Sequence, residues 1–259
     1  MPWQPRRLIV NPTTATLVVF VCVFSGAMLG VLLQRLLPDR HLTAESKDVV
    51  RLAMGLVATT LALVLGLLIA SAKNFYDTQT TEVTQLSANV LLLDRVLSHY
   101  GGEAGEARAA LQKTVNSEIE FMWPQNSVAE SSQLTPRSGE ITLDKIQALA
   151  PTDDRQRSLQ AQAVSLAIQI GQTRMLLYAQ RQIPVPKPLL VMLIFWLIAL
   201  FASFGLFAPR TLTVQVTLLI AAAAVCGAIF LILEMYHPYG GWIQLSDAPL
   251  RAALAQLGQ

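Results

Sequence analysis

The sequence has few charged residues and few of the side chains that build catalytic or metal sites. Only 14% of its 259 residues are charged and 53% are hydrophobic, whereas an average soluble domain is about 25% charged. Its three histidines, His41, His99 and His237, lie far apart, and both cysteines fall inside apolar runs. No phosphate-binding loop, nucleophile elbow or metal-spaced cluster occurs. We therefore expect no enzyme activity, no catalytic residue, no cofactor and no metal ion.

The charge balance also excludes some partners. The net charge of +2 and the absence of a basic run with interleaved aromatics predict no nucleic-acid partner. The long apolar runs, in contrast, contain no ionisable side chain. Proton relays and ion-coupled transporters usually need a carboxylate or histidine at mid-membrane depth, so this absence disfavours them. It disfavours a passive pore less, because hydroxyls and backbone dipoles can line one.

Four apolar runs predict an all-α membrane protein with four spans. They cover residues 14–33, 52–72, 189–208 and 211–233, and each is long enough to cross a hydrocarbon core about 30 Å thick as a helix. The first exceeds the core of about 7–15 residues found in a secretory signal, so we interpret it as an uncleaved span. Residues 1–72 and 188–234 are thus two transmembrane hairpins, and the lipid bilayer is an expected partner.

The second span continues into a soluble helix. Neither Pro nor Gly lies between Gly66 and Gly101, so nothing forces the helix to end at the membrane surface. After Lys73 the residues become polar, but apolar side chains recur at steps of three and four. They are Val83, Leu86, Val90, Leu93, Leu97 and Tyr100. This heptad pattern predicts one long helix that leaves the bilayer and enters water.

Residues 73–187 have a balanced charge and predict a helical soluble domain inserted between spans two and three. The expected elements are helices at about 103–123 and 144–150, an exposed loop at 125–139, a long helix capped by Thr152, and a stiff proline-rich connector at 183–188. The long helix carries a second heptad seam. The two seams favour an antiparallel coiled-coil hairpin within the chain, and a seam between subunits is the alternative.

Residues 235–259 predict an interfacial tail with a short helix. Tyr236, Tyr239 and Trp242 have the chemistry of a membrane-interface belt. The short helix, at about 249–257, is expected to lie along the membrane or along the soluble domain. Four spans place both termini and the soluble domain on one side of the membrane, but positive charges are nearly balanced between the two sides.

Small residues recur at every fourth position in the first two spans. These candidate helix-packing residues are Cys22, Gly26 and Gly30, followed by Ala58, Ala62, Gly66 and Ala70. Such ridges let helices approach closely, within one protomer or between protomers. Thr59 and Thr60 are the polar groups near the centre of span two. Each either bonds to the carbonyl one turn earlier or helps helix packing, or it lines a pore.

Several longer strings resemble one family. Residues 93–104, LDRVLSHYGGEA, with MWP at 122–124, closely resemble the bacterial bestrophin-like membrane proteins. FGLFAPR at 204–210 and GAIFLILE at 227–234, in the third and fourth spans, are similar to the same family. The resemblance extends over essentially the whole chain, and it implies a multi-pass protein of the bacterial inner membrane.

The family name points further, to bestrophins, which are oligomeric anion channels whose pore-lining helix continues into a cytosolic domain. By this analogy the chain is a homo-oligomer permeable to chloride or another small anion, with both termini and the soluble domain in the cytoplasm. The candidate pore-lining residues are Thr59, Thr60, Leu61, Leu65 and Leu68. The alternative is a non-conducting oligomeric scaffold or sensor that acts through its helical domain, because heptad seams and small-residue ridges require no water path.

Overall fold

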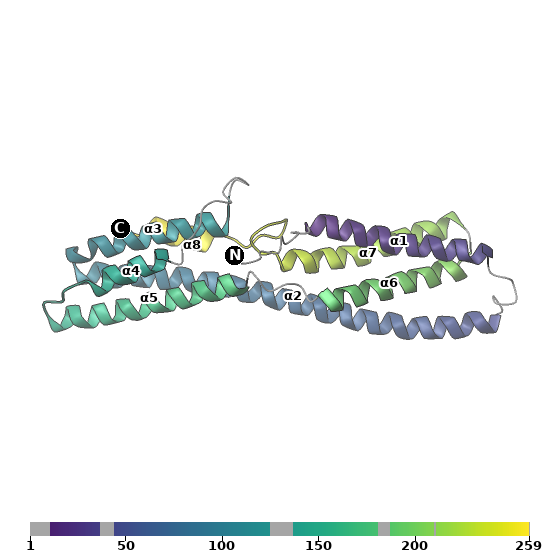
Figure 1. The fold of residues 1–259 in the computed structure, drawn as a ribbon, viewed down its shortest axis with the longest axis horizontal. Helices are drawn as coiled ribbons and strands as arrows, with labels where there is room; N and C mark the ends of the chain where they lie inside the picture. The colour runs from purple at the N-terminus through teal and green to yellow at the C-terminus, as the bar shows by residue number, and fades with distance from the viewer. Residues whose placement is uncertain (1–10, 37–43, 125–136, 181–186, 210, 259) are drawn as a thin grey trace, which may run out of the picture. The chain divides into compact units, whose positions relative to one another are not determined.

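The computed structural model describes residues 11–36, 44–124, 137–180, 187–209 and 211–258, and these residues form an all-α fold (Figure 1). The elements are α1 (Pro12–Leu36), α2 (Ala44–Tyr100), a 3-10 turn at Gly102–Ala104, α3 (Gly105–Met122), α4 (Arg137–Gln147), α5 (Asp154–Gln180), α6 (Lys187–Phe207), α7 (Leu212–Met235) and α8 (Ala248–Gln256). Four of these helices, α1, α2, α6 and α7, are long and apolar enough to span a membrane. The all-α, four-span prediction is confirmed. Most of the predicted loop, residues 125–136, and most of the proline-rich connector, 181–186, lie outside the described residues.

The long helix α2 is continuous, as predicted, and it ends where glycine allows the backbone to turn. It runs for 57 residues from Ala44 to Tyr100. Gly101 follows with a φ of 123°, a conformation that L side chains rarely adopt. The chain divides into two compact units, residues 1–75 with 184–236 and residues 76–183 with 237–259. Helix α2 contributes to both, and each unit has its own hydrophobic core.

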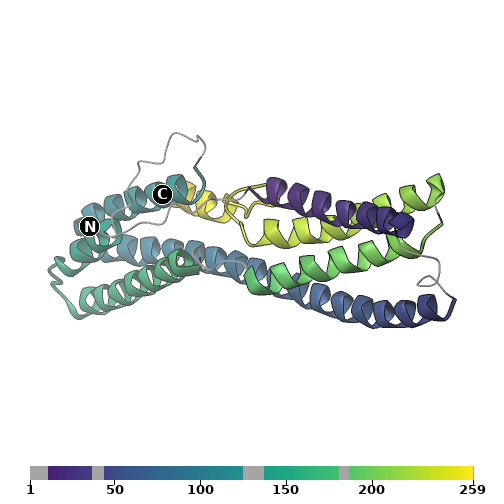
Figure 2. The same cartoon turned by 45° about the vertical axis from the view of Figure 1, so that its right-hand side comes forward.

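The first unit is held together most tightly where α1 crosses α6. Helix α1 packs against both α6 and α7 (Figures 1 and 2). A Cβ added at Gly30 would lie 2.0 Å from the carbonyl oxygen of Ala202, and one added at Gly205 would lie 2.0 Å from that of Ala27. The two backbones therefore touch through reciprocal glycines. The surrounding core contains Val19 and Val23 of α1, Leu61 and Leu68 of α2, Leu193, Leu197 and Phe201 of α6, and Ala222, Cys226 and Ile229 of α7.

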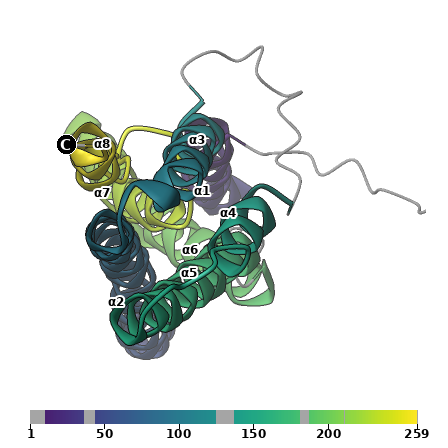
Figure 3. The ribbon, with the colours of Figure 1, turned by 90° about the vertical axis from the view of Figure 1, so that its left-hand side faces the viewer.

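The second unit is a helical bundle formed by the later part of α2 with α3, α4, α5 and α8, seen end-on in Figure 3. All six heptad residues from Val83 to Tyr100 are buried in one core. Helix α5 runs antiparallel to α2, because Gln79 bonds to Gln180 at one end of the pair and Gln156 donates to the Tyr100 carbonyl, 3.2 Å away, at the other. Helices α3 and α8 complete this core with Leu111, Val115, Ile119, Leu250 and Ala253.

Two helix boundaries in the second unit differ from the sequence-based prediction. Helix α4 begins at Arg137, inside the expected loop, and ends at Gln147. It can end there because the Gln160 amide donates to the carbonyls of Ile146 and Leu149, at 3.0 and 2.8 Å. Thr152 does not cap α5. The Asp153 carboxylate accepts from the Gln156 backbone N–H at 2.6 Å, whereas Thr152 donates to the Gln156 side chain.

The residues after α7 also belong to the second unit. Helix α8 packs on α3, and the Trp123 indole donates to the Leu245 carbonyl at 2.8 Å. Tyr239 lies edge-on to Trp123 and donates to Gln79 at 2.7 Å. Gln79 donates to Gln180, which donates in turn to Glu82 at 2.8 Å. This directional chain of hydrogen bonds ties the segment after α7 to α2 and α5. Of the three aromatic residues expected at the membrane interface, Trp242 is strongly exposed, at 83%.

The second unit buries an ion pair. Arg174 of α5 contacts Glu118 of α3 at 2.7 Å, and both side chains are less than a tenth exposed. Tyr178 lies one turn further along α5, and burial together with the nearby Glu118 charge raises its pKa to about 12. In contrast, Arg157 and Asp154 form an exposed pair at 2.5 Å within the first turn of α5. The two pairs offer a matched comparison, because removing one partner strands a buried charge only in the first.

We expect Gly30→Ala to destabilise the first unit by about 1–3 kcal/mol, because the new methyl group would collide with the Ala202 backbone. The matched control is Gly66→Ala, since a Cβ there meets no atom within 4 Å. Thermal unfolding of the purified protein in detergent measures both. The reciprocal packing would be contradicted if the two variants unfolded at the same temperature.

We expect Glu118→Gln to cost about 3 kcal/mol or more, because it leaves the Arg174 guanidinium buried without its counter-charge. Asp154→Asn, which removes one partner of the exposed pair, should cost less than about 1 kcal/mol. Chemical denaturation followed by tryptophan fluorescence compares them. Equal midpoints for the two variants would show that the buried pair does not stabilise the bundle.

Candidate functional site

The second span is the least covered of the four within a single chain. In its most apolar stretch 11% of the residues are buried, against 28% in α1 and α6 and 33% in α7. Leu61 and Leu68 are the large side chains of this span that turn into the core of the first unit. Leu52 and Leu63, on the other side, are 78% and 76% exposed. Most of the surface of this span is therefore available to lipid, to water or to another protein chain.

The exposed surface of α2 consists of two different stripes. One carries small side chains at steps of four, three, four and four, and we refer to it as the small-residue stripe: Gly55, Thr59, Ala62, Gly66 and Ala70, all exposed. Beside it lies a leucine stripe made of Leu52, Leu56, Leu63 and Leu67. These spacings keep each set on one side of a helix. The leucine stripe has the composition expected of a surface in lipid, whereas the small-residue stripe does not.

The glycines of this stripe differ from those of α1. A Cβ built at Gly55 or Gly66 meets no atom within 4 Å. Gly26 and Gly30, in contrast, lie directly against α6, where a Cβ would come within 3.0 and 2.0 Å of its atoms. Cys22 is exposed and lies outside this contact. The two glycines of α1 thus pack within the chain, whereas most of the small residues of α2 are exposed and can face something else.

The structure does not bring the five predicted pore-lining residues to one face. Thr59 and Thr60 are exposed, and both hydroxyls donate to the Leu56 carbonyl, at 2.8 and 2.9 Å. Leu61 and Leu68 are buried against the chain's own helices, and Leu65 is half-buried beside them. Of the predicted helix-packing residues in α2, Ala62, Gly66 and Ala70 share the exposed side with Thr59, and Ala58 is half-buried.

Positive charge flanks the uncharged span at both ends. Arg51 precedes it and Lys73 follows it, and both side chains are exposed. Lys73 lies two turns after Gly66, which places it on the side of the small-residue stripe. Asp48 lies 3.6 Å from Arg51 and offsets part of its charge. Flanking cations favour anions over cations near the span.

The two threonines limit what the span offers an anion. Each hydroxyl has one hydrogen, which it donates to the backbone, so its outward side presents lone pairs. To donate to an anion, a hydroxyl would have to rotate and give up that backbone bond, which is worth about 1 kcal/mol. The site can therefore contact anions weakly but holds no fixed donor for them.

Two features of the site escape sequence reasoning. One is Gly205 of α6, the counterpart of the α1 glycines. Its signal is a glycine in the third span with Ala202 and Ala208 three residues away on either side. The other is the leucine stripe, whose members are separated by four, seven and four residues and so lie on one side of the helix. In the described part of the chain, no three His, Cys, Asp or Glu side chains gather where they could hold a metal ion.

The family follows from comparison of the sequence with family models. The model of the bestrophin-like domain matches residues 21–250. The chain belongs to the bestrophin-like family. A search of curated proteins found no match to it. The matched range begins within α1, includes α2 to α7 entirely, and ends within α8.

Solved structures show that this bestrophin-like chain shares its fold with a bacterial Bestrophin homolog from Klebsiella pneumoniae. One point mutant of that protein superposes with a TM-score of 0.68 at 12% identity, covering 98% of each chain. A second mutant gives 0.65 at 14% identity, covering 91% of this chain and 97% of that one. The form phased with zinc gives 0.61 at 13% identity, covering 90% and 94%. Identities this low establish the fold alone.

Proposed function

We propose that this bestrophin-like chain forms a homo-oligomeric channel permeable to chloride or other small anions. The observation that carries the proposal is the small-residue stripe of α2, which is exposed although it lies in a membrane span. In the oligomer, Thr59, Ala62 and Gly66 line a water path. Membership of the bestrophin-like family supports the same function.

The composition of the exposed surfaces favours this arrangement. The outer surfaces of the other spans carry large apolar side chains that suit lipid, such as Leu29 of α1, Phe195 of α6 and Ile220 of α7. Small side chains leave room for water and bring polar backbone closer to it. Burial of Leu61 and Leu68 in the core favours a structural role for them, so in this proposal Thr59 is the threonine at the axis and those leucines stabilise its helix.

Anion preference would come from the ends of the span. Arg51 and Lys73 attract anions, and no carboxylate lies between them. The threonine hydroxyls bind anions only weakly, and weak binding permits rapid release, which conduction requires. In this proposal both termini and the soluble domain, residues 73–187, lie in the cytoplasm and the spans lie in the bacterial inner membrane.

The test is chloride efflux from liposomes that contain the purified oligomer. We expect efflux above that of empty liposomes, and we expect Gly66→Phe to reduce it at least tenfold, because the ring would fill the path. Gly227→Phe is the matched control, since Gly227 of α7 is an exposed glycine of another span that also has open space around it. Size-exclusion chromatography confirms that each variant keeps its oligomeric state.

Absence of efflux from a well-folded oligomer, over a range of pH and calcium concentration, would overturn the channel. It would leave the non-conducting scaffold or sensor, whose partners would bind the helical unit. Equal loss of efflux in both phenylalanine variants would show that the effect of Gly66→Phe is not specific to the stripe.

Single cysteines map the wet face independently of conduction. In a background carrying Cys22→Ala and Cys226→Ala, we expect cysteine at position 59, 62 or 66 to react with a membrane-impermeant thiol reagent. Cysteine at position 61 or 68 should resist it, because those side chains point into the core. The reactive species is the thiolate, which forms only where water reaches. Uniform resistance at positions 59, 62 and 66 would contradict a water path along this stripe.

A further inference from the structure

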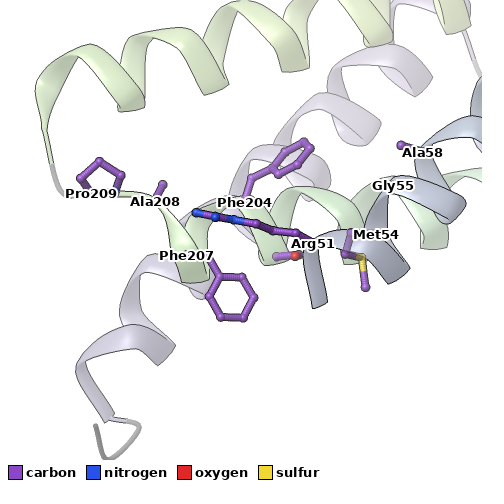
Figure 4. A pocket seen from close by; sticks show the side chains of 9 residues that line it. Arg51, Met54, Gly55, Ala58, Phe204, Phe207, Ala208 and Pro209 are labelled. Atoms are coloured by element: carbon purple, nitrogen blue, oxygen red, sulfur yellow. The ribbon is translucent and has the colours of Figure 1, made fainter. Parts of the chain in front are cut away.

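A cavity lies in the first unit between the early turns of α2 and the end of α6. Its volume is about 380 Å³, within the range of roughly 300–1,000 Å³ typical of small-molecule sites. Its walls are mostly apolar and include Met54 and Ala58 of α2 and Phe204 and Phe207 of α6. Figure 4 shows these side chains around the open space. A cavity with such walls in a membrane protein suits a hydrocarbon chain.

One charged side chain changes the chemistry of this cavity. Among the described residues that line it, Arg51 alone is charged. Its side chain extends from α2 towards Ala208 and Pro209 at the end of α6 (Figure 4). Its ion-pair partner, Asp48, lies 3.6 Å away, and the two side chains are 66% and 71% exposed. A surface pair of this kind contributes little, so the guanidinium retains donors for an anion.

A second cation lies on the same side of α2. Lys47 precedes Arg51 by one helical turn, which places both on one face, and its side chain is half-buried. The cavity thus has an apolar body and a cationic edge. Arg51 is also the last charged residue before the uncharged stretch 52–72, so the edge lies at the depth of lipid headgroups and the body at the depth of acyl chains.

We propose that this cavity binds an anionic phospholipid, with the phosphate on Arg51 and Lys47 and an acyl chain between α2 and α6. Basic pockets between transmembrane helices are known to hold anionic headgroups. A free phosphate would engage the guanidinium but leave the apolar volume empty. A zwitterionic lipid would fill the volume but carry its own cation next to Arg51. The anionic lipid satisfies both parts of the cavity.

A purely structural role for Arg51 explains less of the site. A cation beside the carboxyl end of α6 complements the helix dipole, and this accounts for the charge at that position. It does not account for an apolar cavity of about 380 Å³ beside the charge. The lipid site is also independent of the channel, because a non-conducting scaffold would offer the same cavity.

Native mass spectrometry of the detergent-solubilised protein tests the site with two probes, phosphatidylglycerol and phosphatidylcholine of equal chain length. We expect phosphatidylglycerol to bind about tenfold more tightly, and Arg51→Gln to remove that preference. Arg51→Lys should retain most of it. Ala58→Phe, which fills the cavity, should weaken the binding of both lipids. Lys113→Gln is the charge control, because it removes an exposed cation of α3 in the second unit. It should leave the binding of both lipids unchanged.

Glycerol phosphate, which carries the headgroup charge without acyl chains, separates the sources of the anion. If it displaces phosphatidylglycerol at similar concentrations while Ala58→Phe has no effect, the cavity is an anion site only and the lipid proposal is wrong. Equal binding of the two lipids, or an unchanged preference in Arg51→Gln of normal thermal stability, would overturn the proposal as well. Loss of chloride efflux with unchanged lipid binding would count against the channel proposal and leave the lipid site in place.

Discussion

One constraint governs this protein: a single unbroken helix contributes to two compact units, each with its own hydrophobic core. In the bilayer every backbone group must be bonded internally, so α2 has to remain helical through the membrane. An isolated helix is marginal in water. The later part of α2 is stabilised by its heptad residues from Val83 to Tyr100, which are buried in one core with residues of α3, α5 and α8. The helix ends only at Gly101, where the backbone turns through a positive φ.

Small residues have two different surroundings in the spans of the first unit. In α1 and α6 they allow two backbones to touch, as at Gly30 and Gly205. Without a hydrophobic force between helices in lipid, such close packing is a main source of association. In α2, in contrast, a Cβ built at Gly55 or Gly66 meets no atom of the chain within 4 Å. Composition alone therefore cannot assign a role to a glycine; its surroundings decide.

Features that depend on local pattern can be predicted from the residues alone. Hydropathy and spacing are local, so they indicate the four spans, the continuity of α2 and the buried seam. The partner of a face is a tertiary property. The sequence of a span that is apolar all round does not indicate which side faces the protein core. For that reason the sequence alone cannot predict that Leu61 and Leu68 are buried in the core whereas Thr59 is exposed on another side of α2. Likewise, the end of α4 depends on Gln160, a residue of another helix.

The two candidate functions make opposite demands on the same residues. A scaffold would cover Gly66 with a neighbouring helix as closely as α6 covers Gly30, and the stripe would then be dry. A channel needs that surface wet, with Thr59 able to exchange its bond to the Leu56 carbonyl for a passing anion. In the proposed channel, an uncharged span with flanking Arg51 and Lys73 would give anions an attractive entrance and no deep binding site. The function of this bestrophin-like chain therefore depends on whether water or protein lies against Gly66.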